Sequence, residues 1–294
     1  MDQFLEHLII GIGRGSIYAL LALAIVLIYR STGLLNFAQG EMAMFSTFVA
    51  WTFQDNGANV WVSIIAAMAL SLVGGAVIER VIMRPVEGGS PLNIVIVTIG
   101  LFLGLNALAQ WVWGTDPRTF ENPFSGESRS VIGVSISAEL VGRLVVLAIV
   151  VLLLFVLFQK TKLGLAMRAV ASNTESSGLV GINVGRMLMV GWGLAAALGA
   201  LAGCLTAASD TQFGTSLMVQ VLVFAFAAAT LGGLDSPIGA VVGGLIVGVV
   251  QELLGEYVGF VGTDMRDGAA FVIILGILLV KPSGLFGKQQ VARV

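Results

Sequence analysis

The sequence predicts an all-α protein that crosses a membrane several times, and three features of its composition lead to this prediction. Of the 294 residues, 57% are hydrophobic and 11% are charged, and the mean hydropathy is +0.98. A soluble domain carries about 25% charged residues, so an ordinary soluble enzyme, a disordered chain and a nucleic-acid binder are excluded. The single cysteine, Cys204, and the single histidine, His7, exclude a disulfide framework, a zinc ribbon and chemistry that needs two histidines. We therefore expect a transmembrane pathway rather than an enzyme, with no metal or cofactor site.

Nine apolar segments are candidate transmembrane helices, because a helix that crosses about 30 Å of hydrocarbon needs about 20 mostly apolar residues. The second, seventh and ninth segments are short, so we expect eight or nine crossings in a single transmembrane domain over residues 1–294. All six prolines fall outside the segments or at their ends, where a helix breaker belongs. The segments are 8–29, 39–54, 60–82, 93–113, 138–159, 187–208, 218–232, 238–256 and 267–281.

The charges in the loops predict the orientation of the chain. Ten of the fifteen Lys and Arg residues lie in one set of loops, which includes 160–186, whereas most of the acidic residues lie in the other set. Because short loops with excess Lys and Arg stay on the cytoplasmic side, we expect an outside N-terminus and a cytoplasmic C-terminus. The loop 114–137 then faces the exterior.

Two segments bounded by glycines suggest a partial internal repeat. Residues 33–40 and 232–239 both begin and end with glycine, both carry Leu followed by Asn36 or Asp235, and lie 199 residues apart. A second landmark, Arg-Pro at 84–85 and Lys-Pro at 281–282, recurs at a similar offset. We expect a parallel duplication of about three helices, with helix breaks at Gly33, Gly40, Gly232 and Gly239. Such breaks at membrane depth point to a pathway; the alternative is a pair of tight cytoplasmic turns with capping Asn and Asp.

Polar residues within the segments are the other pathway candidates, because polar groups in a membrane helix usually face the protein interior. Glu41 is expected either to hold the first break or to bind a cargo ammonium group; otherwise it snorkels at the cytoplasmic surface. Asn106 and Gln110 share one helix face and either line a polar path or hydrogen-bond a neighbouring helix. The full pathway set is Asn36, Gln39, Glu41, Asn106, Gln110 and Asp235.

Two further patterns concern packing and surface charge. Glycines spaced four apart, at 199/203, 239/243 and 244/248, are expected to let helices approach closely. Gln251, Glu252 and Glu256, near the outer end of the eighth segment, are expected to be solvated, or else to form a docking surface for a basic patch on a binding protein.

The long cytoplasmic loop 160–186 is expected to be ordered. Its first part suggests a short amphipathic helix, and Asn173 or Thr174 can cap a second helix with Glu175 in its first turn. That helix is expected to run to about Leu179 and to stop at Gly181. It either rests on lipid headgroups or docks a cytoplasmic partner.

Several motifs resemble one family of transporters. Glu175-Ser176-Ser177, followed after three residues by Gly181, is similar to the Glu-Ala-Ala-x-x-x-Gly loop of ABC importer permeases, although both alanines are serines here. The similarity to permeases of branched-chain amino acid ABC importers, the high-affinity leucine, isoleucine and valine type, extends from about residue 10 to about residue 287. It is carried by 33–41, Glu79-Arg80 with Arg84-Pro85, Gly164-x3-Arg168-Ala169, Gly181-Ile182-Asn183, Gly232-Gly233 with Pro237-x-Gly239-Ala240, and 281–285. Asp235 departs from the family, which commonly has glycine there.

The resemblance implies a membrane subunit that has no ATPase activity of its own. It implies two cytoplasmic ATPase subunits, a second homologous permease, an extracytoplasmic solute-binding protein and a place in the bacterial inner membrane. ATP and Mg would bind the partner subunits, because the nearest P-loop fragment here ends in Lys288-Gln289 and lacks the required Ser or Thr. The residues implied to couple ATPase motion to the spans are Arg168, Asn173, Thr174, Glu175, Ser176, Ser177, Gly181 and Ile182.

The cargo is less closely fixed than the transporter class. Branched-chain amino acids are expected, and urea or short amides are the alternative, because importers of those compounds have similar permeases. A secondary transporter or channel that works alone is the alternative from another class. Ion coupling would require carboxylates in mid-span, and none is expected, because Glu41 and Asp235 stand at the ends of segments.

Overall fold

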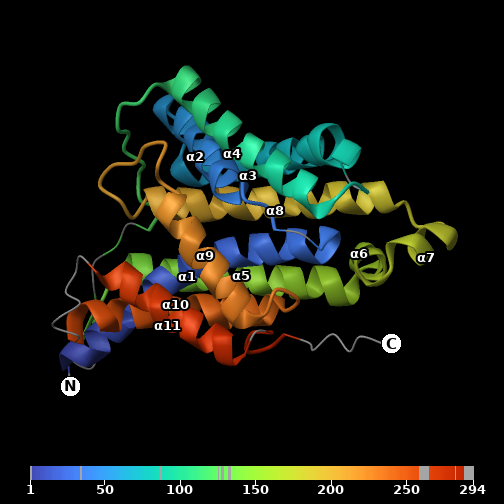
Figure 1. Ribbon diagram of the computed structural model, residues 1–294. Helices are drawn as coiled ribbons and strands as arrows, with labels where there is room; N and C mark the ends of the chain where they lie inside the picture. The colour runs from blue at the N-terminus through green and yellow to red at the C-terminus, as the bar shows by residue number, and fades with distance from the viewer. Residues whose placement is uncertain are drawn as a thin grey trace. The chain divides into compact units, whose positions relative to one another are not determined.

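The computed structural model describes residues 2–33, 35–86, 88–124, 126, 129–131, 134–257, 265–281 and 283–287 (Figure 1). The helices and strands of this part of the chain are joined by loops. The regular structure is helical, as predicted, apart from a hairpin of two three-residue strands, which the all-α prediction did not include: β1 (Arg129–Val131) and β2 (Val134–Ile136). The helices are α1 (Asp2–Thr32), α2 (Gln39–Asp55), α3 (Val60–Ile78), a π-turn (Glu79–Met83), a 3₁₀ turn (Arg84–Val86), α4 (Pro91–Trp113), α5 (Ala138–Lys160), α6 (Lys162–Ser172), α7 (Thr174–Leu179), α8 (Val184–Ala207), α9 (Val219–Gly232), α10 (Pro237–Tyr257) and α11 (Arg266–Val280).

Each of the nine predicted segments corresponds to one helix, and most boundaries agree within three residues. Six helices of the described chain are long and apolar enough to cross a membrane: α1, α3 with its continuing turns, α4, α5, α8 and α10. Helices α2, α9 and α11 have 17, 14 and 15 residues, which is fewer than the about 20 residues that a full crossing needs. Within the described residues, length and composition thus support six crossings, where eight or nine were expected.

The chain divides into two compact units, which are described separately. One comprises residues 1–26, 124–145 and 220–294, and the other comprises 27–123 and 146–219. We call them the α10 unit and the α8 unit, each after one of its helices.

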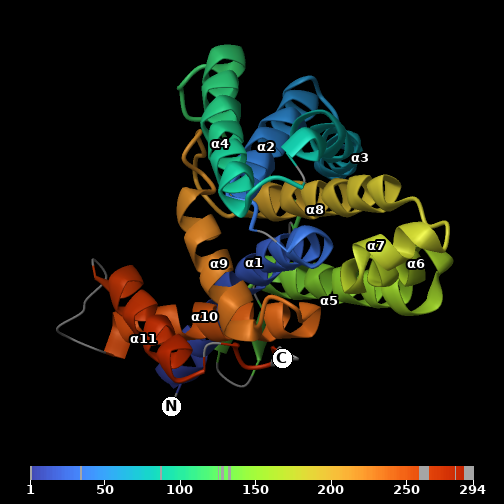
Figure 2. The ribbon, with the colours of Figure 1, turned by 45° about the vertical axis from the view of Figure 1, so that its right-hand side comes forward.

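Helix α8 forms the core of the α8 unit. Its sequence is rich in Ala and Gly, and small side chains let α2 and α3 pack closely against it (Figure 2). Phe48 of α2 completes this core by contacting the rings of Trp113 and Phe213. In contrast, α3 and α4 expose rows of large aliphatic side chains, which is typical of helices that face lipid.

In the α10 unit, close approach of backbones joins α10 to α1 and to α9. A Cβ atom at Gly244 would lie 2.5 Å from the backbone nitrogen of Ala19 on α1, and one at Gly248 would overlap the backbone of Gly15. A Cβ atom at Gly243 would overlap the carbonyl of Ala228 on α9. The small-residue spacing therefore marks helix contacts, as predicted.

Candidate functional site

The first helix break lies inside the α8 unit, halfway along α8. The side-chain amide of Gln39, the first residue of α2, donates a hydrogen bond to the carbonyl of Ala195 at 3.0 Å. Ala195 is the twelfth of the 24 residues of α8, and 24 helical residues span about 36 Å. Helix α2 then runs parallel to α8, because Ala43 contacts Gly199 and Thr47 contacts Gly203. Helix α2 therefore begins at the level of the middle of a full-length helix.

Glycine and amide side chains form this break. Gly33 follows the last residue of α1 and has φ +73°, a left-handed conformation that glycine adopts without strain. The Asn36 side chain accepts a hydrogen bond from the backbone N–H of Ala38 at 3.0 Å and donates one to Gln39 at 3.3 Å. Both side chains are buried, so the break is a set of internal hydrogen bonds rather than a solvated surface turn. Gly40 belongs to the first turn of α2 and does not interrupt it.

Glu41 is buried beside this break, in contact with α4. Its side chain is 1% exposed and its Oε2 accepts a hydrogen bond from Asn106 at 3.1 Å. Asn106 also donates to the carbonyl of Thr215 at 3.1 Å and accepts from Gln110 at 2.6 Å. The expectation that no carboxylate lies in mid-span is therefore wrong for Glu41. Glu41 lies in the first turn of α2, and that helix begins in the interior of the α8 unit.

The buried hydrogen bonds of Glu41 lead to a prediction about stability. Replacing Glu41 by alanine removes an acceptor of the Asn106 amide and leaves a buried cavity, so we expect the free energy of unfolding to fall by about 2 kcal/mol. Glu41→Gln keeps a side-chain oxygen, so its free energy of unfolding should fall by less than about 1 kcal/mol. Denaturant unfolding of the purified chain measures both variants, and equal losses would contradict the role given to this oxygen.

A cavity of about 190 Å³ lies between α2, α3, α4 and α8 of the same unit. Its walls are mostly apolar, and Ser71 donates a 2.7 Å hydrogen bond to Ser46 within them. The cavity is lined by Met42, Phe45, Ser46, Val49, Leu70, Ser71, Gly74, Gly75, Ile78, Leu105 and Ala196. An aliphatic side chain is the kind of group that such walls accommodate.

The second glycine-bounded segment lies in the α10 unit and has a different form. Gly232 ends α9 and Gly239 lies in the first turn of α10, where the two backbones touch. The left-handed residue is Gly233, with φ +102°. Asp235 is exposed, and the hydroxyl of Ser236 accepts the hydrogen bond from the N–H of Gly239. Pro282, part of the second repeat landmark, lies outside the described residues.

The loop between α5 and α8 folds as two short helices, each capped at its N-terminus. Asn173 accepts a hydrogen bond from the N–H of Ser176 at 2.8 Å, so it caps α7 as predicted. Ser177 is the buried residue of α7 and donates to the carbonyl of Asn173 at 2.7 Å. Helix α7 ends at Leu179, and Gly181 has φ +85°. The backbone N–H of Ile182 donates to the Ser177 carbonyl at 3.0 Å and closes the loop.

The other residues implied to couple ATPase motion lie on α6 and in the first turn of α7. Thr174 and Glu175 are exposed in the first turn of α7, and the Thr174 hydroxyl donates to the carbonyl of Val170 at 3.2 Å. Arg168, on α6, donates to the side chain of Gln159 at 3.3 Å.

The sequence did not indicate that two aliphatic residues at the end of α7 are exposed. Leu179 is 89% exposed and Val180 is 77% exposed. The amphipathic pattern of a six-residue helix is too short to show which side chains the rest of the chain leaves uncovered, so this surface became visible only in the structure.

Acidic residues at the end of α10 are paired rather than solvated. Glu252 forms an ion pair with Arg14 at 2.9 Å and accepts a hydrogen bond from His7 at 3.3 Å, and Gln251 accepts one from the Tyr18 hydroxyl at 2.7 Å. Glu256 lies 3.6 Å from His7 and is half-exposed. The expectation of a solvated acidic surface is therefore wrong for Gln251 and Glu252, which join α10 to α1.

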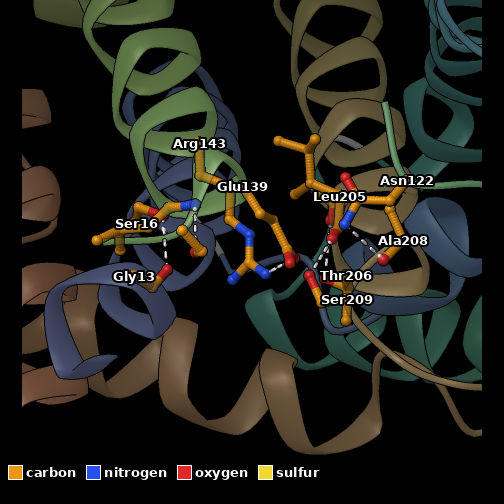
Figure 3. A network of polar contacts seen from close by, with 12 residues as sticks. Gly13, Ser16, Asn122, Glu139, Arg143, Leu205, Thr206, Ala208 and Ser209 are labelled. Atoms are coloured by element: carbon orange, nitrogen blue, oxygen red, sulfur yellow. Dashed lines mark hydrogen bonds and ion pairs between the residues drawn. The ribbon is translucent and has the colours of Figure 1, made fainter. Parts of the chain in front are cut away.

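Figure 3 shows further polar contacts in each unit. In the α10 unit, Arg143 and Glu139 form an ion pair one turn apart on α5. In the α8 unit, the Ser209 hydroxyl donates to the carbonyl of Leu205 and the Asn122 amide donates to that of Ala208. These bonds satisfy carbonyls at the end of α8, where a helix leaves acceptors without partners in its own backbone.

These features define a membrane transport subunit: a bundle of apolar helices with a buried polar break and an ordered helix outside the spans. The chain belongs to the family of branched-chain amino acid transport system permease components, whose model matches residues 8–281. It is therefore a transport subunit and not an enzyme. In the part of the chain that the structure describes, no group of three His, Cys, Asp or Glu residues could hold a metal ion.

Relatives of this chain are similar over nearly its full length. The high-affinity branched-chain amino acid transport system permease protein LivH of Escherichia coli is 30% identical, over 99% of this chain and 98% of that protein. The corresponding permease protein BraD of Pseudomonas aeruginosa is 32% identical, over 99% of this chain and 98% of that protein. The fructose import permease protein FruF of Bifidobacterium longum is 26% identical, over 81% of this chain and 67% of that protein.

Proposed function

We propose that this chain moves branched-chain or related small amino acids into the cytoplasm, driven by ATPase subunits that bind helix α7. The observation that carries the proposal is the pair of exposed aliphatic side chains at the end of α7, Leu179 and Val180. The backbone that presents them is fixed by the Asn173 cap and by the buried hydroxyl of Ser177. An ordered apolar tip of this kind is suited to insertion into a pocket on another protein.

The proposed partners are two cytoplasmic ATPase subunits, a second homologous permease and an extracytoplasmic solute-binding protein. In this arrangement the chain is one permease domain in the bacterial inner membrane, with the N-terminus outside and the C-terminus in the cytoplasm. The shorter helices α9 and α11, and the break at 33–38 together with α2, then complete nine crossings. The left-handed glycines Gly33 and Gly233, each directly after a helix, support a partial parallel repeat.

The proposed pathway passes the break at the start of α2. Asn36, Gln39, Glu41, Asn106 and Gln110 supply buried amide and carboxylate groups there. Asp235, with Gly232 and Gly239, would be the corresponding point of the second repeat. Movement of α7 on ATP binding would displace α8. Because the break bonds to the midpoint of α8, this displacement would rearrange the break as well. Such a change is a form of alternating access.

The proposed cargo rests on the relatives and on one structural feature. LivH and BraD are named for branched-chain amino acids, and the apolar cavity of about 190 Å³ beside the break suits an aliphatic side chain. FruF, also similar to this chain, is named for fructose, so the family alone does not fix the cargo. Uptake of labelled leucine, valine, urea and a short amide by the complete complex in liposomes distinguishes the candidates.

The docking proposal is tested by a double substitution, Glu175→Lys with Gly181→Trp. Charge reversal in the first turn of α7 and a bulky residue at a left-handed position should disrupt the docking surface. We expect at least a tenfold loss of ATPase subunits copurifying with the chain, and a matching loss of uptake. Glu121→Lys, an exposed reversal in another loop, is the matched control and should change neither. Intact copurification of the double variant would exclude α7 as the docking site.

A second experiment addresses transport by the chain alone. Liposomes that contain only the purified chain should take up no cargo without ATP and the partner subunits. ATP-independent uptake by these liposomes would identify a channel or facilitator instead.

A further inference from the structure

An ion pair at the cytoplasmic end of α3 joins two helices of the α8 unit. Arg84 donates two hydrogen bonds to the carboxylate of Glu79, from Nε at 3.1 Å and from Nη2 at 2.6 Å. The same Nη2 donates to the backbone carbonyl of Gly185, in the first turn of α8, at 2.8 Å. Glu79 is fully buried, with an exposed fraction of 0%. One guanidinium therefore connects a buried carboxylate to the start of α8.

The π-turn explains how Glu79 and Arg84 meet. In an α-helix, residues five apart point about 140° away from each other. In the π-turn, the backbone N–H of Arg84 bonds to the carbonyl of Glu79, so the two residues lie one above the other. Such turns occur mostly as single insertions and often at functional positions. Here the turn creates the bidentate pair.

An ion pair with one fully buried member, Glu79, and one half-buried member, Arg84, is a costly way to stabilise a helix end. Removing a carboxylate from water carries a large desolvation penalty, and a buried ion pair is weak support for a purely stabilising role. The geometry provides a rigid connection, because the planar guanidinium holds both carboxylate oxygens and a carbonyl in fixed directions.

The connected residues stand between the coupling loop and the helix break. Gly185 comes two residues after Asn183, which caps α8, and α7 ends shortly before it. On the other side, α3 packs against α2, where Ser71 bonds to Ser46, and against α8. A displacement of the start of α8 therefore reaches α3 through Arg84.

We propose that Arg84 is a positioning residue that makes α3 and the start of α8 move together when α7 is displaced. The inference rests on the proposed docking of ATPase subunits at α7. It assigns to the Glu79–Arg84 pair the transmission of motion, and not the binding of the ATPase.

Two variants of different kinds test the link. Arg84→Lys keeps the charge but loses the bidentate fork. Gly185→Ala leaves both charged residues intact, but its new Cβ atom would lie 2.9 Å from Arg84 Cζ and displaces the guanidinium. We expect each variant to bind ATPase subunits normally and to raise the ATP hydrolysed per cargo molecule at least fivefold, because uptake falls while hydrolysis continues. Arg80→Gln, an exposed change on the same π-turn, is the matched control and should keep the wild-type ratio.

The readouts separate this inference from the proposed function. A purely structural role would reduce folded protein, ATP hydrolysis and uptake together, with an unchanged ratio. Normal ATPase binding with an unchanged ratio in both variants would overturn the role of Arg84. A wild-type chain that fails to bind ATPase subunits would instead overturn the docking proposal.

Discussion

Replacing Gly244 by valine should lower the free energy of unfolding of the purified chain by about 3 kcal/mol or more. The physical reason is the contact between α10 and α1. Even the first added carbon would lie 2.5 Å from the backbone nitrogen and 2.6 Å from the Cα of Ala19. A backbone cannot turn aside as a flexible side chain does, so the helices must separate and lose the contacts around Gly15 and Gly248. Thermal or denaturant unfolding in detergent measures the loss.

A glycine on another helix supplies the control for this prediction. Gly104 lies inside α4, and a Cβ atom added there would contact nothing within 4 Å. Gly104→Ala should therefore keep the stability or raise it, by up to about 1 kcal/mol, from helix propensity. If Gly244→Val and Gly104→Ala shift the unfolding midpoint equally, the close contact of α1 and α10 does not determine the stability.

The helices and their caps were predictable because their signals are local. Runs of apolar residues fixed the ranges of the nine segments, and Asn173 marked the start of α7 because a capping side chain bonds to a backbone group only a few residues away. The glycines at 244 and 248 predicted a close contact through their spacing. Which helix they contact is a tertiary fact, and the sequence did not indicate α1.

The depth of the first break was not predictable for the same reason. Glu41 stands at the start of a segment, and a position at the start of a segment normally means the membrane surface. Only the bond from Gln39 to Ala195 reveals that α2 begins beside the middle of α8. The pairing of Glu252 with Arg14 and His7 likewise joins residues more than 200 positions apart, which no pattern within one helix can indicate.

A double serine variant, Leu179→Ser with Val180→Ser, should prevent the permease from binding its ATPase subunits while its own fold stays intact. The two side chains are 89% and 77% exposed, so they bury little within this chain, and its free energy of unfolding should change by no more than about 0.5 kcal/mol. If α7 inserts these side chains into the ATPase, we expect at least a tenfold loss of copurifying ATPase subunits and of ATP-driven uptake. Affinity purification from membranes and uptake into liposomes measure the two losses.

Leu165→Ser on α6 distinguishes docking from contact with lipid. Leu165 is also a large exposed aliphatic residue of the loop between α5 and α8, but it lies outside the helix assigned to the partner. A helix that merely rests on headgroups would depend on Leu165 and on Leu179 in the same way, because lipid contact follows apolar area. An ATPase that docks at α7 responds only to the pair at the helix end. Equal losses for the two variants, or none for the double serine variant, would therefore assign these side chains to the membrane surface.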